Sequence, residues 1–332
     1  MVECNSVAAL AAVGAIFLGY KVFTLFKTLF DVFVVPGISL KKFGAGQGYW
    51  AVITGATDGI GKEFALQLAK NKFNVLLISR TTSKLEGVAQ EIADKYGVET
   101  KIFAMDFGKG NPEDFNKVSE IINSIPVGVL VNNVGTNHDI PTPFVEEDEN
   151  VINSIIEVNI KGLMKMTKIV LPQMKQNRKG LILNMGSFAG LVPSPWLSVY
   201  SASKAFLLAW SQALGMEVAK DGITVEHLNT YFVVSAMSKI KRASLLIPTS
   251  KDYVISALAK IGVPCGANTP FTSTPYATHG LANWAINNLF SRKFWITQNY
   301  NIQKDIRKRA LRKREREAAA AAAAAAEKSK SN

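Results

Sequence analysis

The sequence has few of the residues that mark several protein classes. It contains two cysteines, Cys4 and Cys265, in 332 residues and no Asn-x-Ser/Thr glycosylation site. This scarcity argues against a disulfide framework and fits a reducing compartment. The three histidines, His138, His227 and His279, lack metal-ligand spacing, so we interpret them as ordinary polar residues and expect no metal site.

Acidic residues are also scarce, with 26 against 38 basic residues and a net charge of +12. Much of the excess lies in residues 304–317, which hold eight basic and three acidic residues. This run fits a solvated helix face or attraction to anionic lipid headgroups. No segment resembles a nucleic-acid-binding module, so we expect no nucleic-acid partner.

One long apolar run is present, Val7 to Phe26, and as a helix it would span about 30 Å, one hydrocarbon core. Lys21 lies near one end and can reach the interface. The alternative, a cleaved signal peptide, normally begins with positive charge, whereas this segment begins with Glu3. We therefore favour an uncleaved anchor. The lysines on its C-terminal side (Lys21, Lys27, Lys41 and Lys42) predict that the rest of the chain is cytosolic.

Apolar segments of strand length alternate with amphipathic segments along the middle of the chain. We predict strands at Trp50–Ile53, Asn74–Ser79, Thr100–Met105, Val129–Val131, Gly180–Met185 and Ile223–Leu228. Helices are expected up to Lys70 and at Lys84–Tyr96, Asp148–Lys175 and Ser201–Ala219. The expected fold is α/β, with one Rossmann-type doubly wound parallel sheet. We divide the chain into an anchor (1–42), a central α/β domain (43–300) and a basic helical tail (301–332).

A glycine-rich turn, residues 54–61, comes after the first strand and before a helix. Its glycines let the backbone approach a pyrophosphate that the helix N-terminus stabilises. The next strand ends in Arg80. An acidic residue there would bind a ribose 2′-hydroxyl, whereas arginine suits a 2′-phosphate, so Arg80, helped by Lys62, favours NADP(H). The alternative is an ordinary surface arginine.

Tyr200 and Lys204 lie four residues apart at the start of a predicted helix, so their side chains share one face. A nearby ammonium favours the phenolate and lowers a tyrosine pKa towards the range needed for acid catalysis. Ser187 comes after a predicted strand, thirteen residues before Tyr200, and offers a hydroxyl to the same space. Tyr-x-x-x-Lys by itself is a common pattern, so its place in the chain decides its meaning.

The order of these features, with Asn132-Asn133-Val134-Gly135 and an isolated Asn159 between them, resembles the short-chain dehydrogenase/reductase family from about residue 49 to about 241. The resemblance implies four catalytic residues: Asn159, Ser187, Tyr200 and Lys204. It implies cofactor contacts from Val52, Gly55, Thr57, Asp58, Gly59, Ile60, Gly61, Arg80, Asp106, Asp114, Asn133, Tyr200, Lys204, Val233 and Ser235. Asp114 equally fits a residue that complements a helix dipole, and Asn159 one that distorts a helix.

Val134 stands where most family members have alanine, and the usual Pro-Gly is missing after the sixth strand. There the sequence Phe232-Val233-Val234-Ser235-Ala236-Met237-Ser238-Lys239 resembles membrane-bound very-long-chain 3-oxoacyl-CoA reductases and related 17β-hydroxysteroid dehydrogenases. This resemblance implies NADPH-dependent reduction of a 3-oxoacyl-CoA during fatty-acid elongation, beside a condensing enzyme, a dehydratase and an enoyl reductase. The alternatives are a steroid or retinoid oxidoreductase and a non-catalytic membrane scaffold with a vestigial NADP site.

Beyond Lys241 the pattern is less informative, and no final strand is evident. We predict helices at Ile255–Ile261 and at Leu281–Phe294, an aromatic-rich segment that fits a core helix, a lid over an acyl chain or a second membrane contact. Nine alanines, 318–326, form a helix-prone spacer. The ending Lys328-Ser329-Lys330-Ser331-Asn332 resembles a retrieval signal of endoplasmic-reticulum membrane proteins, which predicts that location.

Overall fold

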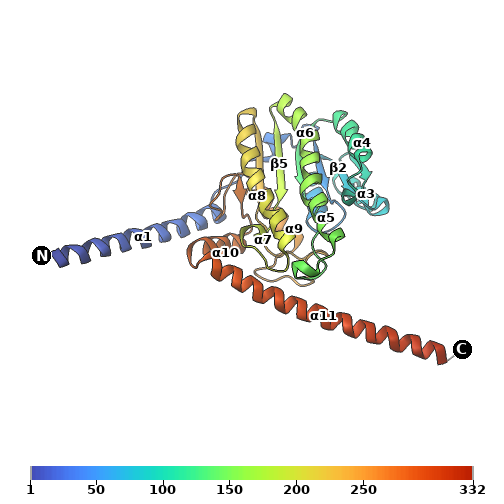
Figure 1. The fold of residues 1–332 in the computed structure, drawn as a ribbon. Coiled ribbons are helices and arrows are strands. Elements are labelled where there is room, and N and C mark those ends of the chain that lie inside the picture. The colour runs from blue at the N-terminus through green and yellow to red at the C-terminus, as the bar shows by residue number, and fades with distance from the viewer. Residues whose placement is uncertain (1, 331–332) are drawn as a thin grey trace.

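The computed structural model describes residues 2–330, and it confirms the predicted α/β fold. Seven parallel strands form one sheet in the order β3-β2-β1-β4-β5-β6-β7, with helices on both faces (Figure 1). The strands are β1 (Trp50–Thr54), β2 (Asn74–Ser79), β3 (Thr100–Ala104), β4 (Val127–Asn132), β5 (Gly180–Met185), β6 (Ile223–Leu228) and β7 (Thr272–Ser273). Chain order reverses at β1 and β4, so the carboxyl ends of these strands form the usual ligand-binding crevice.

The inner strands are buried on both faces, as parallel sheets require. Alternate residues of β1 enter different cores: Ala51 and Ile53 face one cluster, and Val52 faces the other. The first face is covered by α2 (Gly59–Lys70), α3 (Thr82–Tyr96) and α9 (Ser250–Ala259). The second is covered by α4 (Pro112–Asn123), α6 (Leu163–Asn177) and α8 (Ser198–Val218). The short helices are α7 (Phe188–Leu191) and turns at Leu40–Phe43, Phe107–Lys109, Phe144–Glu146 and Ala219–Asp221.

Two predicted helices are divided in the structure, and one strand was not predicted. The helix predicted at 148–175 is α5 (Glu149–Ile156), a π-helical turn (Glu157–Gly162) and α6 in succession. The prediction of one helix at 281–294 is wrong at its C-terminal end. There α10 (Ala277–Asn288) ends, and a separate helix, α11 (Arg292–Lys330), begins. The final strand, for which the sequence carries no clear pattern, is the two-residue β7 paired with β6.

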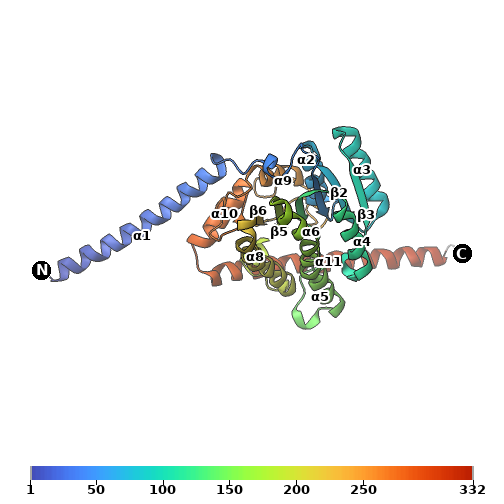
Figure 2. The same cartoon turned by 90° about the horizontal axis from the view of Figure 1, so that it is seen from above.

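The N-terminal helix α1 (Val2–Phe33) projects from the domain (Figures 1 and 2). Its residues 6–33 are long and apolar enough to cross a membrane. The apolar side chains along this helix are exposed; Leu10 and Ile16, for example, are each 72% exposed. Only its C-terminal part contacts α10, where the Trp284 indole nitrogen donates to the Thr24 hydroxyl at 3.1 Å. The helix is therefore a candidate membrane anchor, and it extends beyond the predicted Phe26.

The basic C-terminal segment is helical, as predicted, and forms the second half of α11. This helix passes beneath the carboxyl edge of the sheet, with its C-terminal end far from α1 (Figure 1). The face of α11 that packs against the domain presents one residue every three or four positions. These residues include the buried Gln303 and the half-buried Asn299 and Arg307. The Lys-x-Lys-x-x ending lies partly outside the described residues.

Candidate functional site

The glycine-rich turn between β1 and α2 is built by close backbone packing. Gly55 and Gly59 have positive φ angles of 69° and 54°, a conformation that favours glycine. A Cβ at position 61 would lie 2.1 Å from the Gly55 carbonyl oxygen, so only glycine fits there. The Asp58 carboxylate accepts a hydrogen bond from the Gly59 amide at 2.7 Å. The result is a tight turn at a helix N-terminus, which suits a phosphate group.

Two polar side chains hold this turn against β4. The Asn133 amide nitrogen donates to the carbonyl oxygens of Thr54 and Gly55, at 3.0 and 3.2 Å. The Thr54 hydroxyl accepts from the backbone amides of Asn133 and Val134, at 3.0 and 3.1 Å. Asn133 was predicted from the sequence, but Thr54 was not, although a polar residue that ends an apolar strand just before the glycines was an available signal.

The other predicted cofactor residues lie mostly along the same sheet edge. Arg80 comes directly after β2 and is exposed, whereas its predicted helper Lys62 pairs instead with Glu91 at 2.7 Å. Asp106 lies just beyond β3 and accepts from the Gly108 amide at 3.0 Å. Asp114 lies in the first turn of α4, where it complements the helix dipole. Among the described residues, no hydrogen bond joins its side chain to another predicted cofactor residue.

Ser187, Tyr200 and Lys204 come together at the carboxyl end of β5. Ser187 caps α7, accepting from the Ala189 amide at 3.2 Å. Tyr200 lies in the first turn of α8, and the Lys204 ammonium lies 5.7 Å from the centre of its ring. That ammonium is buried and donates to the Met185 carbonyl oxygen at 2.8 Å. The predicted shared space for hydroxyl, phenol and ammonium is therefore present.

The electrostatics of this group differ from the expectation. Burial raises the pKa of Tyr200, and a hydrogen bond with Ser187 acts in the opposite direction. Burial also lowers the pKa of Lys204 to about 8. The lowering of the tyrosine pKa by Lys204 that we predicted is not seen in this structure, because burial has the larger effect and the ammonium is directed to the Met185 carbonyl.

Asn159 lies inside the π-helical turn and is almost fully buried, at 1% exposed. Its side-chain oxygen accepts from the Thr136 amide at 2.8 Å, and its nitrogen donates to the Ser203 hydroxyl at 3.1 Å. That hydroxyl donates to the Tyr200 carbonyl oxygen at 2.7 Å. Asn159 therefore coincides with a helix distortion and braces the catalytic helix. Its role in a proton relay stays a prediction, and Ser203 is a supporting residue that sequence analysis missed.

His227, which we interpreted as an ordinary polar residue, lies close to the candidate site. It is buried in β6, and a Cβ at Gly186 would lie 2.1 Å from its Nε2 atom. Burial lowers its pKa to about 3, and the nearby Lys204 charge acts in the same direction. A neutral imidazole therefore packs directly behind the turn that presents Ser187.

The segment after β6 folds back over the glycine-rich turn. Val233 is buried, and a Cβ at Gly59 would lie 3.3 Å from the Ser235 Cβ atom. The Ser238 hydroxyl donates to the Val233 carbonyl oxygen at 2.7 Å, which makes this segment a compact loop. Val233 and Ser235 thus lie beside the turn that we predicted to bind the same cofactor.

Helix α11 contacts the two loops that flank Ser187, Tyr200 and Lys204. Asn299 donates to the Val192 carbonyl oxygen at 3.1 Å, in the loop between Ser187 and Tyr200. Arg307 donates to the Pro141 carbonyl oxygen at 2.8 Å and pairs with Glu146 at 2.7 Å, in the loop after β4. The tail is therefore part of the wall around the candidate active site.

The family model described as short chain dehydrogenase matches residues 49–245. This chain belongs to that family. It is also 49% identical to a very-long-chain 3-oxoacyl-CoA reductase of Laccaria bicolor, over 92% of this chain and 91% of the relative. A relative of the same name from Neurospora crassa is 45% identical, over 92% of each chain. This similarity extends well beyond the family segment.

Solved structures with lower identity share the fold. A 7β-hydroxysteroid dehydrogenase is 22% identical, with a TM-score of 0.68 over 79% of this chain and 99% of that one. A short-chain dehydrogenase from Sphingobium yanoikuyae, solved with NADPH, is 24% identical, with a TM-score of 0.60 over 73% of this chain and 97% of that one. Both confirm the architecture around the sheet.

Proposed function

We propose that this protein reduces a very-long-chain 3-oxoacyl-CoA to the 3-hydroxyacyl-CoA with NADPH, in fatty-acid elongation. The observation that carries the proposal is the 49% identity to a reductase of that name over 92% of this chain. Because the similarity covers far more than residues 49–245, it includes sequence outside the part common to the family. The grouping of Ser187, Tyr200 and Lys204 supports the same chemistry.

The residues present fit the cofactor. The tight turn at residues 55–61 leaves room for a pyrophosphate at the N-terminus of α2, and the exposed Arg80 suits a 2′-phosphate. When bound, NADPH supplies a hydride for the carbonyl carbon. Val233 and Ser235, in the segment that folds back towards Gly59, would contact its nicotinamide end. Asp106, on the next strand, would contact the adenine.

The side chains of this protein handle the proton. Tyr200 donates a proton to the ketone oxygen as negative charge develops there. Ser187 hydrogen-bonds the same oxygen and stabilises that charge. Lys204, held by the Met185 carbonyl, orients the cofactor ribose and provides positive charge near the phenol. Asn159 keeps α8 in register with the loop after β4, so that Tyr200 stays aligned.

The proposed location is the endoplasmic-reticulum membrane, with the catalytic domain on the cytosolic side. The apolar α1 and the lysines on its C-terminal side support this orientation. A long acyl chain partitions strongly into lipid, because each buried methylene contributes about 0.8 kcal/mol. The condensing enzyme, dehydratase and enoyl reductase of elongation are the proposed partners, since their products and substrates are shared.

The test is NADPH oxidation by detergent-solubilised protein given a long-chain 3-oxoacyl-CoA. Tyr200→Phe removes the proton donor, and we expect a rate loss of about 10²- to 10⁴-fold with NADPH binding retained. The matched control is Tyr96→Phe, at the far end of α3, which should leave the rate unchanged. A wild-type protein that binds NADPH but reduces a ketosteroid or retinal instead would overturn the substrate assignment. Full activity in Tyr200→Phe would overturn the mechanism.

A further inference from the structure

The turn between α10 and α11 carries an exposed aromatic cluster. Leu289 and Phe290 are each 55% exposed, and Phe294 is 37% exposed. The Phe290 and Phe294 rings stack with centres 4.4 Å apart, and Trp295 packs edge-on against them at 5.7 and 5.2 Å. A large apolar surface of this kind is unusual on a protein that faces only water. Arg292 and Lys293 lie within it and are also exposed.

Two hydrogen bonds hold the end of α10, just before this turn, against the C-terminal part of α1. The Lys21 ammonium donates to the Asn288 side-chain oxygen at 2.9 Å, one residue before the aromatic turn begins. The indole nitrogen of Trp284 donates to the Thr24 hydroxyl at 3.1 Å. Figures 1 and 2 show the α10–α11 turn on the side of the domain from which α1 leaves. The turn therefore lies alongside apolar helix that is itself exposed.

The length of α1 places this contact at membrane depth. Its apolar segment has 28 residues, or about 42 Å at 1.5 Å per residue, whereas a hydrocarbon core is about 30 Å thick. If the core begins at Ser6, it ends about 20 residues later, near Phe26, and Lys21 lies inside that boundary. In this register Asn288 and the adjoining turn reach the bilayer.

We propose that residues 289–294 form a second membrane contact, which inserts into the lipid beside α1. This inference rests on the membrane anchor in the proposed function. Leu289, Phe290 and Phe294 supply the apolar surface, while Arg292 and Lys293 suit anionic headgroups. The occupant of the exposed aromatic surface is therefore a lipid bilayer, and the contact is continuous with the exposed side of α1.

The position of α10 gives this contact a consequence for the active site. At its other end, the Thr278 hydroxyl donates to the Leu245 carbonyl oxygen at 2.9 Å, and His279 Nε2 lies 3.0 Å from the Leu246 carbonyl oxygen. Both carbonyls belong to the chain that folds back over the site after β6. Helix α10 thus connects the proposed lipid contact to the segment after β6 that folds over the site. This connection holds the candidate active site near the bilayer surface.

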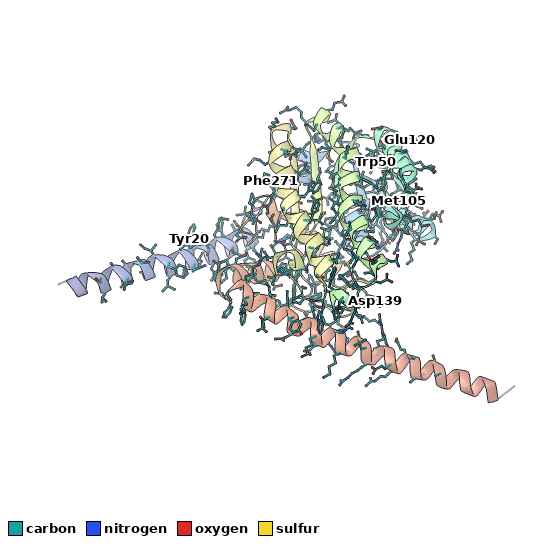
Figure 3. All side chains as sticks on the ribbon, viewed as in Figure 1. Tyr20, Trp50, Met105, Glu120, Asp139 and Phe271 are labelled. Atoms are coloured by element: carbon teal, nitrogen blue, oxygen red, sulfur yellow. The ribbon has the colours of Figure 1, made fainter. Side chains whose placement is uncertain are left out.

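The test uses full-length protein in vesicles of phosphatidylcholine and phosphatidylserine, with a fluorescent NBD label on single cysteines. Cys4→Ser gives the background, since Cys265 is fully buried and burial raises its pKa to about 12. Labels are placed at Phe290→Cys, Tyr20→Cys on α1 and Glu120→Cys on α4. Figure 3 shows the last two positions at opposite ends of the molecule. NADPH binding checks the fold of each labelled protein.

We expect the Phe290 label to shift to shorter wavelength and to be quenched by lipids brominated on their acyl chains, as strongly as the Tyr20 label. The Glu120 label should be unaffected. Quenching at Tyr20 but not at Phe290, nor at a second label on Lys293→Cys, would overturn the second contact and leave the anchor intact. No quenching at Tyr20 would instead overturn the anchor and, with it, the membrane location in the proposed function.

Discussion

The cofactor edge of the sheet and helix α11 differ in how they are held. The glycine-rich turn is fixed by buried hydrogen bonds and backbone contacts that leave no room for a methyl group. Helix α11 is held mainly by side-chain contacts near the surface, including the Arg307–Glu146 ion pair and the contact of Asn299 with Val192.

This difference separates two demands on the enzyme. Hydride transfer needs a geometry fixed within a fraction of an ångström, and dense packing supplies it. The proposed contact with a lipid-borne substrate needs an exposed surface that can adapt. Substitutions at the cofactor edge should therefore cost more than substitutions in α11.

The largest effect is expected at Gly61. In Gly61→Ala the new methyl group would meet the Gly55 carbonyl at 2.1 Å and the Asn133 side-chain nitrogen at 2.4 Å, so the turn must open. Overpacking of this kind costs about 3 kcal/mol, a loss of roughly 150-fold in NADPH affinity by fluorescence titration. Gly87→Ala, in the middle of α3 with no atom within 4 Å, is the control and should stabilise the protein slightly. Equal NADPH affinity in both variants would contradict this account.

Arg80 should have the next largest effect, confined to cofactor choice. Arg80→Ala removes a charge-assisted hydrogen bond to a 2′-phosphate, worth about 2 kcal/mol, or roughly thirtyfold in the preference for NADPH over NADH. Lys62→Ala should change this preference far less, because Lys62 pairs with Glu91. The ratio of kcat/KM values for the two cofactors measures it. An unchanged ratio in Arg80→Ala would assign arginine an ordinary surface role.

Glu226 lies outside both regions, in β6, where its carboxylate accepts from the Gly262 amide at 2.8 Å in the loop after α9. Burial raises its pKa from 4.5 to about 8. Between these values the folded protein keeps a proton that the unfolded chain releases, so this group stabilises the fold at low pH and loses that effect as pH rises towards 8. The slope is about 1.4 kcal/mol per pH unit at most.

Urea unfolding of the solubilised protein across this pH range measures the slope. We expect Glu226→Gln, which resembles the protonated acid, to remove it. The exposed Glu120→Gln should keep it. If wild type and Glu226→Gln show the same pH dependence, Glu226 is not the group responsible.

The smallest effect is expected in α11. Arg307→Ala removes contacts to Pro141 and Glu146, and an exposed pair of this kind is worth about 1 kcal/mol or less. Hydrogen exchange in residues 139–147 should become faster. Arg309→Ala is the matched control, since the Arg309 side chain donates to the Asp305 carbonyl of its own helix. Faster exchange in both variants would show that helix propensity, rather than docking, holds the loop.

Much of the fold could be predicted because its signals are local. The strands at Asn74–Ser79, Gly180–Met185 and Ile223–Leu228 have the predicted bounds, since short apolar runs between helical patterns have few other structures available. Ser187, Tyr200 and Lys204 converge because the carboxyl ends of parallel strands meet at one edge of the sheet. The supporting residues Ser203 and His227 were missed, because serine and histidine at such positions carry no distinctive pattern. Thr54 was missed although it ends an apolar strand just before the glycines.

The sheet, the glycine-rich turn and the apolar helix could be predicted from the amino-acid order alone, because periodicity and spacing encode them directly, whereas the grouping of Ser187, Tyr200 and Lys204 was predicted from a family resemblance. The folded structure was needed to establish where α11 lies, that the segment predicted as one helix turns at residues 289–291, and that Lys21 meets Asn288. These features depend on contacts between residues more than a hundred positions apart, such as Asn299 with Val192 and Arg307 with Pro141. No local pattern specifies such pairs, because each side chain finds its partner only after the sheet has brought the two segments together.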